Sequence, residues 1–492
     1  MTTQHGGSSE SPAQAGAFDS HHPPSPELIS DCVHCGFCLP ACPTYELTGE
    51  EMNSPRGRIY QMKLISEGEA PLDAAAVSHF DNCLGCMACV TACPSGVRYD
   101  QLIESVRPQI ERNWARSRGD RAFRELIFRL FPYPRRLRWA AVLGAVYQRL
   151  GIRRVLSRTG LLRRLPARLR ALEALMPDVP LRAALRRTPV RSKALGLAGT
   201  ETPPDPSSDT RPEPDSPATS APAGEPPMAE PSMGEPAEGA PVAPAAAARR
   251  TVGMVTGCVQ QVFFAQVNEA TVRVLTAEGC DVIAPAEQGC CGALSEHAGR
   301  EEEAAGRARR LIDVFEPLDV DTIVVNVAGC GSALKEYGRL LADDPRYRER
   351  AEAFAAKVRD ISELLAELPP SAPRHPVPAR LAHHEACHLA HAQGVREQPR
   401  AVLRAIPELD VVDIPEADMC CGSAGVYNLI QPEPAEELGR RKAGNVRSTA
   451  PDAVVTANPG CLLQISRHLD KQLPVLHPVQ VVDASIRGVR PW

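Results

Sequence analysis

Two cysteine runs near the N-terminus constrain this chain more than any other part of its sequence. The first reads C-V-H-C-G-F-C-L-P-A-C-P from Cys32, and the second reads C-L-G-C-M-A-C-V-T-A-C-P from Cys83. Both follow the spacing C-x2-C-x2-C-x3-C-P, in which three thiolates surround one [4Fe–4S] cluster and the fourth cysteine ligates the cluster of the other run. Structural zinc sites also use C-x2-C, but they need only four ligands and rarely add a third cysteine at this spacing before C-P.

The crossed pattern predicts two clusters with defined ligands. Arg56, Arg58 and Lys63 follow the first run and bring positive charge near the two anionic sites. These charges either belong to solvated surface, or they raise the cluster potentials or meet an acidic partner. A helix is expected from Arg58 to Glu67. The predicted ligands are Cys32, Cys35, Cys38 and Cys93 for the first [4Fe–4S] cluster, and Cys83, Cys86, Cys89 and Cys42 for the second.

The 17 cysteines of this 492-residue chain raise the alternative of a secreted disulfide framework. Such a framework needs an export signal, yet the N-terminus is polar and rich in Ser, Gly and Pro. No run of 18 apolar residues occurs, so no membrane span is expected. We therefore expect a cytoplasmic protein whose reduced, clustered cysteines bind metal. The formal net charge of −5 argues neither for nor against nucleic acid.

Composition and motif positions divide the chain into six segments. The basic third segment has apolar residues at helical spacing between Leu137 and Val155, with Arg at the remaining positions. This pattern predicts an amphipathic helix that packs on the cluster domain, lies on an anionic membrane or docks on a partner subunit. Because stacking aromatics are not interleaved with its basic residues, no nucleic-acid partner is expected. The segments are a disordered tail (1–25), a two-cluster ferredoxin-like domain (26–115), a basic helical segment (116–197), a Pro/Ala-rich disordered linker (198–248), and two Cys-rich repeats (249–375 and 376–492).

The C-terminal half is an internal duplication. Three motifs recur at offsets of 129, 130 and 131 residues: a lone Cys, a Cys-Cys-Gly and a further Cys. Each unit alternates strand and helix patterns, which predicts parallel strands with the cysteines at their carboxyl ends. The predicted fold is a multi-domain α+β protein, with an α-helical bis-[4Fe–4S] ferredoxin-like domain followed by duplicated α/β Cys-rich domains with parallel sheets. The candidate metal ligands of the repeats are Cys258, Cys290, Cys291 and Cys330, then Cys387, Cys420, Cys421 and Cys461.

Other residues of the repeats carry secondary expectations. Gly292 and Gly422 are expected to let the backbone approach the metal closely. Cys280 has no counterpart in the second repeat and is expected to be a buried small apolar residue. Any one of four histidines around Cys387 is a candidate ligand or proton carrier, and core or surface roles are expected for three of them: His383, His384, His388 and His391.

The motifs resemble the iron–sulfur subunit of glycolate oxidase. The strings S-P-R-G-R-I-Y, Q-G-C-C-G-A-L, N-V-A-G-C-G and C-C-G-S-A-G-V-Y-N-L are similar to that family and to the CCG domains of heterodisulfide-reductase-like proteins. The likeness runs from Pro26 to Trp492, the linker excepted. It implies a complex in which FAD-binding subunits oxidise glycolate to glyoxylate, while this subunit passes the electrons to a membrane acceptor such as quinone. It also implies a cytoplasmic location with peripheral contact on the inner face of the cell membrane.

The resemblance has one departure. The full CCG pattern ends in C-x2-C, whereas Ala333 and Gln464 stand where the second cysteine belongs. Four cysteines per repeat suffice for an ordinary cluster or for zinc, but heterodisulfide cleavage at a non-cubane cluster needs the extra thiolate. No G-x-G-x-x-G follows a strand, so substrate chemistry is expected on a partner and no catalytic residue is assigned to this chain. The alternatives are a heterodisulfide-reductase-like subunit, a subunit of a lactate-oxidising complex, and a scaffold whose repeats hold zinc.

Overall fold

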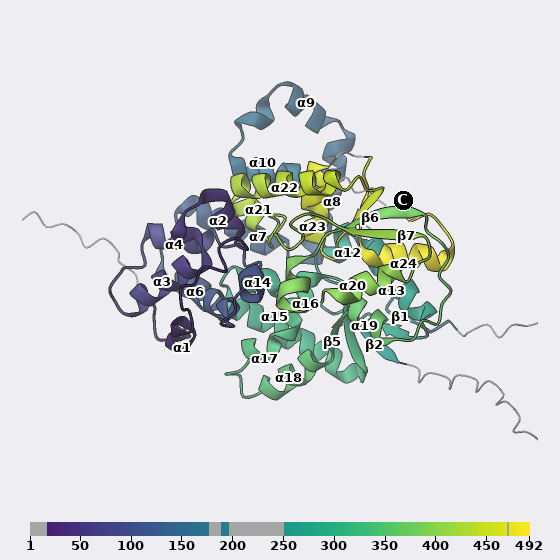
Figure 1. Ribbon diagram of the computed structural model, residues 1–492, viewed down its shortest axis with the longest axis horizontal. Helices are drawn as coiled ribbons and strands as arrows, with labels where there is room; N and C mark the ends of the chain where they lie inside the picture. The colour runs from purple at the N-terminus through teal and green to yellow at the C-terminus, as the bar shows by residue number, and fades with distance from the viewer. Residues whose placement is uncertain (1–16, 177–187, 196–249, 470–471) are drawn as a thin grey trace, which may run out of the picture. The chain divides into compact units, whose positions relative to one another are not determined.

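The N-terminal part of the chain is built from short helices joined by cysteine-bearing loops (Figure 1). The computed structural model describes residues 17–176, 188–195, 250–469 and 472–492. The predicted linker and residues 1–16 of the predicted tail lie outside these ranges. Proline at the first helical position and Ser or Asp caps set several of the helix starts. The elements are α1 (Pro26–Ser30), α2 (Pro43–Thr48), η1 (Glu51–Asn53), α3 (Pro55–Ser66), α4 (Ala74–Asp81), α5 (Ala88–Thr91) and α6 (Tyr99–Asn113).

Residues 17–25 differ from the disordered tail that was predicted. The Asp19 carboxylate accepts hydrogen bonds from Arg112 (2.8 Å) and Asn113 (2.9 Å), both on α6. The hydrogen bond from Arg112 is the main reason why the pKa of Asp19 falls well below its usual value. A polar segment without an apolar pattern is thus held in place by ion pairing, which composition does not reveal.

Five further helical elements follow in the described part of the chain, and they bury only part of the apolar stripe predicted between Leu137 and Val155. Leu137 is buried, whereas Leu143, Leu150 and Val155 are exposed. Among the described residues, no helix combines the length and the apolar character that crossing a membrane requires. The elements are α7 (Arg118–Leu130), α8 (Pro134–Arg149), α9 (Ile152–Arg158), η2 (Leu161–Arg164) and α10 (Ala167–Ala174).

The end of the predicted basic helical segment is a strand. Strand β1 (Arg191–Ser192) pairs antiparallel with β3 (Asp281–Ile283) at the edge of the first sheet. The other strands of that sheet run parallel in the order β3-β2-β4-β5. They are β2 (Thr251–Val255), β4 (Thr322–Val325) and β5 (Val358–Asp360).

The second repeat has a parallel sheet of the same order. Its strands are arranged β7-β6-β8-β9, which repeats the order β3-β2-β4-β5 of the first sheet. The equal order agrees with the duplication inferred from the cysteine offsets. The strands are β6 (Ala379–His383), β7 (Leu409–Asp413), β8 (Ala453–Val455) and β9 (Val475–Leu476).

Helices pack against both sheets, as expected for strands joined by crossover connections. One buried core joins the repeats: Leu275 and Val274 of the first lie with Leu381 and Val481 of the second, and Cys280 is buried in the same core. The first repeat contains α12 (Gln260–Phe263), α13 (Ala265–Ala277), α14 (Ala293–His297), α15 (Glu301–Phe315), η3 (Glu316–Leu318), α16 (Ala328–Lys335), α17 (Tyr337–Leu340), α18 (Arg348–Ala356) and α19 (Ile361–Glu367). The second contains the π-helix η4 (His388–Ala392), α20 (Glu397–Arg404), α21 (Tyr427–Ile430), α22 (Pro432–Ser448), α23 (Pro459–His468) and α24 (Pro478–Arg487).

Candidate metal centres

The first cysteine run gathers at the surface of the N-terminal helices. Cys32, Cys35, Cys38 and Cys93 line one small pocket, together with Cys89. Cys35 is exposed and the other three predicted ligands are half-buried. The Cys93 thiol, although it comes from the second run, therefore lies with the thiols of the first run. The ligand assignment stays a prediction, and this placement supports it.

The second run forms a buried site. Cys83, Cys86 and Cys89 line a second small pocket together with Cys42, which comes from the first run. All four are buried. All 17 cysteines lie in the described ranges and are free thiols, so each predicted set of four sulfurs is available to a cluster. The donor chemistry fits the [4Fe–4S] group that the spacing predicts.

Arg58 is a buried charged residue at the second site. Its side chain is 1% exposed, and it donates to the His79 carbonyl (2.7 Å), to Thr44 Oγ1 (3.0 Å) and to Cys42 Sγ (4.0 Å). Arg56, by contrast, is partly exposed and is paired with Glu51. Arg58 is therefore not solvated surface, and Arg56 lines the pocket of the first run, where it donates to the His34 carbonyl (2.9 Å). Helix α3 begins at Pro55, three residues before the start that was expected.

The charge of Arg58 changes the acidity of a neighbouring thiol. Burial raises the pKa of the Cys86 and Cys89 thiols well above their usual value. Burial acts on Cys83 in the same sense, but the guanidinium groups of Arg58 and Arg107, together with hydrogen bonds from Tyr99 and the Gly85 amide, outweigh it, so the pKa of Cys83 is lowered. Because metal binds the thiolate form, this positive charge favours the ligand state of the site.

Sequence reasoning missed two further partners of Cys83. Tyr99 donates its hydroxyl to the Cys83 sulfur (3.5 Å), and Arg107 donates to the Cys83 carbonyl (2.8 Å). Both residues lie on α6, which begins six residues after Cys93. No motif marks them, because only the packing of α6 on the cysteine loops brings them to the site.

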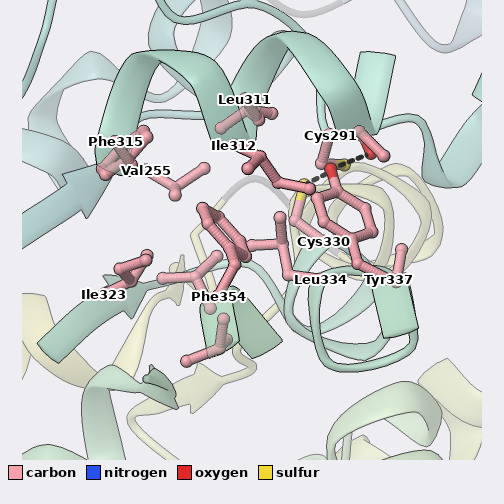
Figure 2. Close-up of a cluster of buried hydrophobic side chains, with 14 of the residues drawn as sticks. Val255, Cys291, Leu311, Ile312, Phe315, Ile323, Cys330, Leu334, Tyr337 and Phe354 are labelled. Atoms are coloured by element: carbon pink, nitrogen blue, oxygen red, sulfur yellow. Dashed lines mark hydrogen bonds between the residues drawn. The ribbon is translucent and has the colours of Figure 1, made fainter. Parts of the chain in front are cut away.

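Each repeat brings its four predicted thiols into a row. In the first repeat, Cys258 lies within hydrogen-bonding reach of Cys290, Cys290 of Cys291, and Cys291 of Cys330 at 3.1 Å. Figure 2 shows Cys291 and Cys330 at one end of the apolar core of that repeat, where the Tyr337 hydroxyl donates to the Cys291 carbonyl (2.6 Å). The second repeat has the same row: Cys387 with Cys420, Cys420 with Cys421, and Cys421 with Cys461.

The two rows line one cavity of about 320 Å³. Seven of the eight repeat cysteines border it, all except Cys421, and Cys86 of the second run borders it too. Cys86 also packs with Cys387 and Cys420 in one buried group. Helix α8 closes the cavity with apolar side chains such as Leu137. The buried site of the N-terminal helices therefore adjoins the site of the second repeat.

The glycines of the two Cys-Cys-Gly motifs have a packing role that the sequence did not indicate. Both have positive φ, 95° at Gly292 and 86° at Gly422. A Cβ at Gly292 would lie 3.2 Å from the Ala304 carbonyl oxygen, and one at Gly422 would lie 2.8 Å from that of Ala435. These glycines therefore let helices α15 and α22 pack closely against the cysteine loops, and the close approach of the backbone to a metal stays a prediction.

Three of the four histidines near Cys387 have contacts of their own. His391 bonds to Thr91 (2.7 Å) and to the Asp418 carbonyl (3.0 Å), and it thereby ties the repeat to α5. His388 borders the cavity and lies 4.7 Å from His297 between ring centroids. His383 Nδ1 lies 3.8 Å from an oxygen of Asp413. The fourth, His384, lies among the thiols.

Family models match separate parts of the chain. Residues 28–97 match the family model of a 4Fe-4S dicluster domain, and residues 252–335 and 381–466 match that of a cysteine-rich domain. Residues 119–176 match a model described as the linker region of the glycolate oxidase iron-sulfur subunit. A probable glycolate oxidase iron-sulfur subunit of Bacillus subtilis (strain 168) is 35% identical over 91% of this chain and 90% of its own length. The chain belongs to the glycolate oxidase iron–sulfur subunit family.

One further relative supports membership of the glycolate oxidase iron–sulfur subunit family, and another widens the comparison. The glycolate oxidase iron-sulfur subunit of Escherichia coli (strain K12) is 30% identical over 93% of this chain and 94% of its own length. A lactate utilization protein A of an Exiguobacterium strain is 28% identical and covers 48% of this chain with 98% of its own length. The family models and these relatives identify an iron–sulfur protein with a 4Fe-4S dicluster domain and two cysteine-rich domains.

Proposed function

We propose that this chain is the iron–sulfur electron-transfer subunit of a glycolate oxidase complex. FAD-binding partner subunits convert glycolate to glyoxylate, and this chain passes the electrons to a membrane acceptor such as quinone. Family membership supports the oxidoreductase complex, and the thiol sites support the role in electron transfer. Bound clusters would supply one-electron steps.

The observation that carries the proposal is the sequence of sites from the surface inward. The site around Cys35 is exposed, the site around Cys83 is buried next to it, and Cys86 packs against Cys387 and Cys420 of the second repeat. Neighbouring metal sites that lead from the surface to the interior serve electron transfer, whereas a purely structural protein does not need them. Val33 and Phe37 are exposed large apolar side chains beside Cys35, and we assign the docking of the flavin-bearing partner to this surface.

The membrane contact is assigned to helices α8 and α9. From residue 126 to residue 172 the chain has twelve arginines and no acidic residue. Trp139, Leu143 and Leu150 are 72%, 68% and 69% exposed, and with Val146 they follow the spacing of a single helix face. Exposed apolar residues next to a run of arginines match an anionic lipid surface, which attracts the charges and takes up the apolar side chains. The inner side of α8 lines the cavity of the repeat cysteines, so the same helix links that surface to the metal sites.

Binding to lipid vesicles tests this contact. We expect the purified chain to sediment with vesicles that contain anionic phospholipid and to stay in solution with purely zwitterionic ones. The double variant Trp139→Glu/Leu143→Glu should reduce binding tenfold or more, since each inserted apolar side chain contributes about 1 kcal/mol or more. Val489→Glu, at an exposed apolar residue outside this helix, is the control and should bind normally. Equal binding by the double variant would show that the membrane contact lies elsewhere.

Reconstitution with the flavin-bearing partners tests the function itself. The complex should reduce a soluble quinone with glycolate, and the isolated chain should not oxidise glycolate at all. Cys86→Ser should stop quinone reduction, while the partner subunits continue to reduce an artificial dye. Glycolate oxidation by the isolated chain would contradict the proposal.

Lactate is the second candidate substrate of the complex, because lactate utilization protein A is among the relatives. Substrate choice belongs to the partner, so the same reconstitution with lactate in place of glycolate decides between them. A heterodisulfide-reductase-like activity has less support. Gln464 stands where the additional cysteine of that pattern belongs, and its amide bonds to Asn428 (3.2 Å) and to the Ala435 carbonyl (2.8 Å).

A further inference from the structure

His384 is a buried side chain that lies among the thiols of the second repeat. It follows directly after strand β6 and is 1% exposed. A ring nitrogen of His384 and the sulfurs of Cys421 and Cys461 lie within 4.8 Å of one another. Three atoms at this spacing, each able to donate a lone pair, are close enough to share one metal centre.

The hydrogen bonds of the His384 ring indicate which of its two nitrogens is available to bind a metal. Nδ1 lies 2.9 Å from Thr456 Oγ1, whereas Nε2 is buried and has no hydrogen-bond partner. With Nδ1–H donating to the threonine hydroxyl, the lone pair of the neutral ring is on Nε2. A metal-bound histidine is commonly held in this way, with one nitrogen on the metal and the other donating to a fixed acceptor. An unpartnered buried nitrogen is otherwise costly, since burial without a hydrogen bond is unfavourable.

The first repeat lacks both residues. Counting back from Cys387 and Cys461 to Cys258 and Cys330, His384 corresponds to Val255 and Thr456 corresponds to Val325. Val255 and Val325 are register partners on β2 and β4, and both are buried in the apolar core, where Figure 2 shows Val255. The histidine and the threonine that supports it are thus present together in one repeat and absent together from the other, at positions that adjoin across the sheet. The difference between the repeats is a matched pair of residues rather than a single substitution.

We propose that Nε2 of His384 is a fifth ligand of the metal centre in the second repeat. Four thiolates and one imidazole nitrogen surround that centre, while four thiolates alone surround the centre in the first repeat. This inference rests on the proposed function, in which both repeats hold metal. The ligand set is one of the features that set the potential of an iron–sulfur centre, so the two centres differ in potential. The row of sites therefore ends in two centres that are not equivalent.

Isotope labelling of the full chain tests the nitrogen ligand directly. The protein is produced once with [15N]histidine and once with natural histidine, and both samples are purified anaerobically. The two samples are compared by pulsed EPR if the repeats hold iron, and by X-ray absorption if the repeats hold zinc. We expect a nitrogen coupling that changes with the histidine isotope, or one nitrogen scatterer among sulfurs at zinc. In His384→Cys this signal should vanish, while the metal content per chain stays unchanged because a thiolate replaces the nitrogen.

His383→Gln is the matched control, because His383 is the neighbouring buried histidine and faces Asp413. It should keep the nitrogen signal. A histidine signal that persists in His384→Cys, or no such signal in the wild-type chain, would overturn the proposal. Metal-free repeats in the wild-type chain would overturn it as well, and they would also remove the proposed relay through the repeats. Metal present without histidine nitrogen refutes only the role of His384, so the two failures are distinguishable.

Discussion

Replacing Cys42 by Ser is expected to remove the cluster of the second cysteine run and to spare that of the first. Cys42 belongs to the first run in sequence, but its thiol lines the pocket of Cys83, Cys86 and Cys89. Loss of one of four thiolate ligands should lower the iron bound by the N-terminal part from about eight atoms per chain to about four. Iron analysis and the EPR spectrum of the dithionite-reduced protein measure this change.

Two controls define the result. Cys93→Ser should have the converse effect, because its thiol lies with the first run. Cys280→Ser should change neither cluster, because Cys280 is buried in the apolar core between the repeats and lies in no thiol row. If Cys42→Ser abolishes the signal of the first-run cluster instead, the crossed ligand assignment is wrong.

Replacing Arg58 by Met is expected to lower both the stability of the protein and the potential of the second-run cluster. The variant loses three buried hydrogen bonds, including those to the His79 carbonyl and Thr44 Oγ1. We expect a loss of about 3 kcal/mol in the free energy of unfolding, since buried groups left without a charged partner cost this much. Denaturant unfolding under anaerobic conditions measures the difference.

The change in potential follows from the charge alone. One unit charge at roughly 6 Å contributes about 3 kcal/mol at an effective dielectric constant of about 20, which corresponds to a fall on the order of 100 mV. A redox titration followed by EPR measures it, and Arg58→Lys should recover a large part because the charge is kept. Arg56→Met is the matched control: this residue is partly exposed and paired with Glu51, so its effect should be much smaller. An unchanged potential in Arg58→Met would show that the guanidinium does not act on that cluster.

The local spacing of the cysteines predicted the grouping of the sites, because the distance between ligands along the chain is set by the cluster itself. The constant offset predicted a duplicated unit with parallel strands, and the structure shows that the two sheets have the same strand order. What spacing cannot predict is burial. Arg56 and Arg58 read alike in S-P-R-G-R, yet two residues along a helix turn the side chain to another face, and only Arg58 enters the core.

Tertiary contacts account for the other differences. Hydrogen bonds to α6 hold the polar residues around Asp19 in place. The residues of β1 belong to a segment with a helical pattern, but they form a strand because they pair with β3 at the edge of the first sheet. Part of the apolar stripe of α8 remains exposed, because helical periodicity shows that a face is apolar without showing what covers it. The pairing of His384 with Thr456 depends on strands more than 70 residues apart, so no local pattern distinguishes His384 from the three histidines beside it.

The most direct measurement is the content of iron, acid-labile sulfide and zinc per chain in protein purified anaerobically. The wild-type chain should be compared with the variant Cys291→Ser/Cys421→Ser, which removes a central thiol from each repeat. If electrons pass through the repeats, the wild-type chain should contain more than the eight or so irons of the dicluster domain, and the variant should fall to about that number. If wild-type iron already equals about eight and zinc accounts for the repeats, only the two N-terminal clusters move electrons, and the repeats are a scaffold.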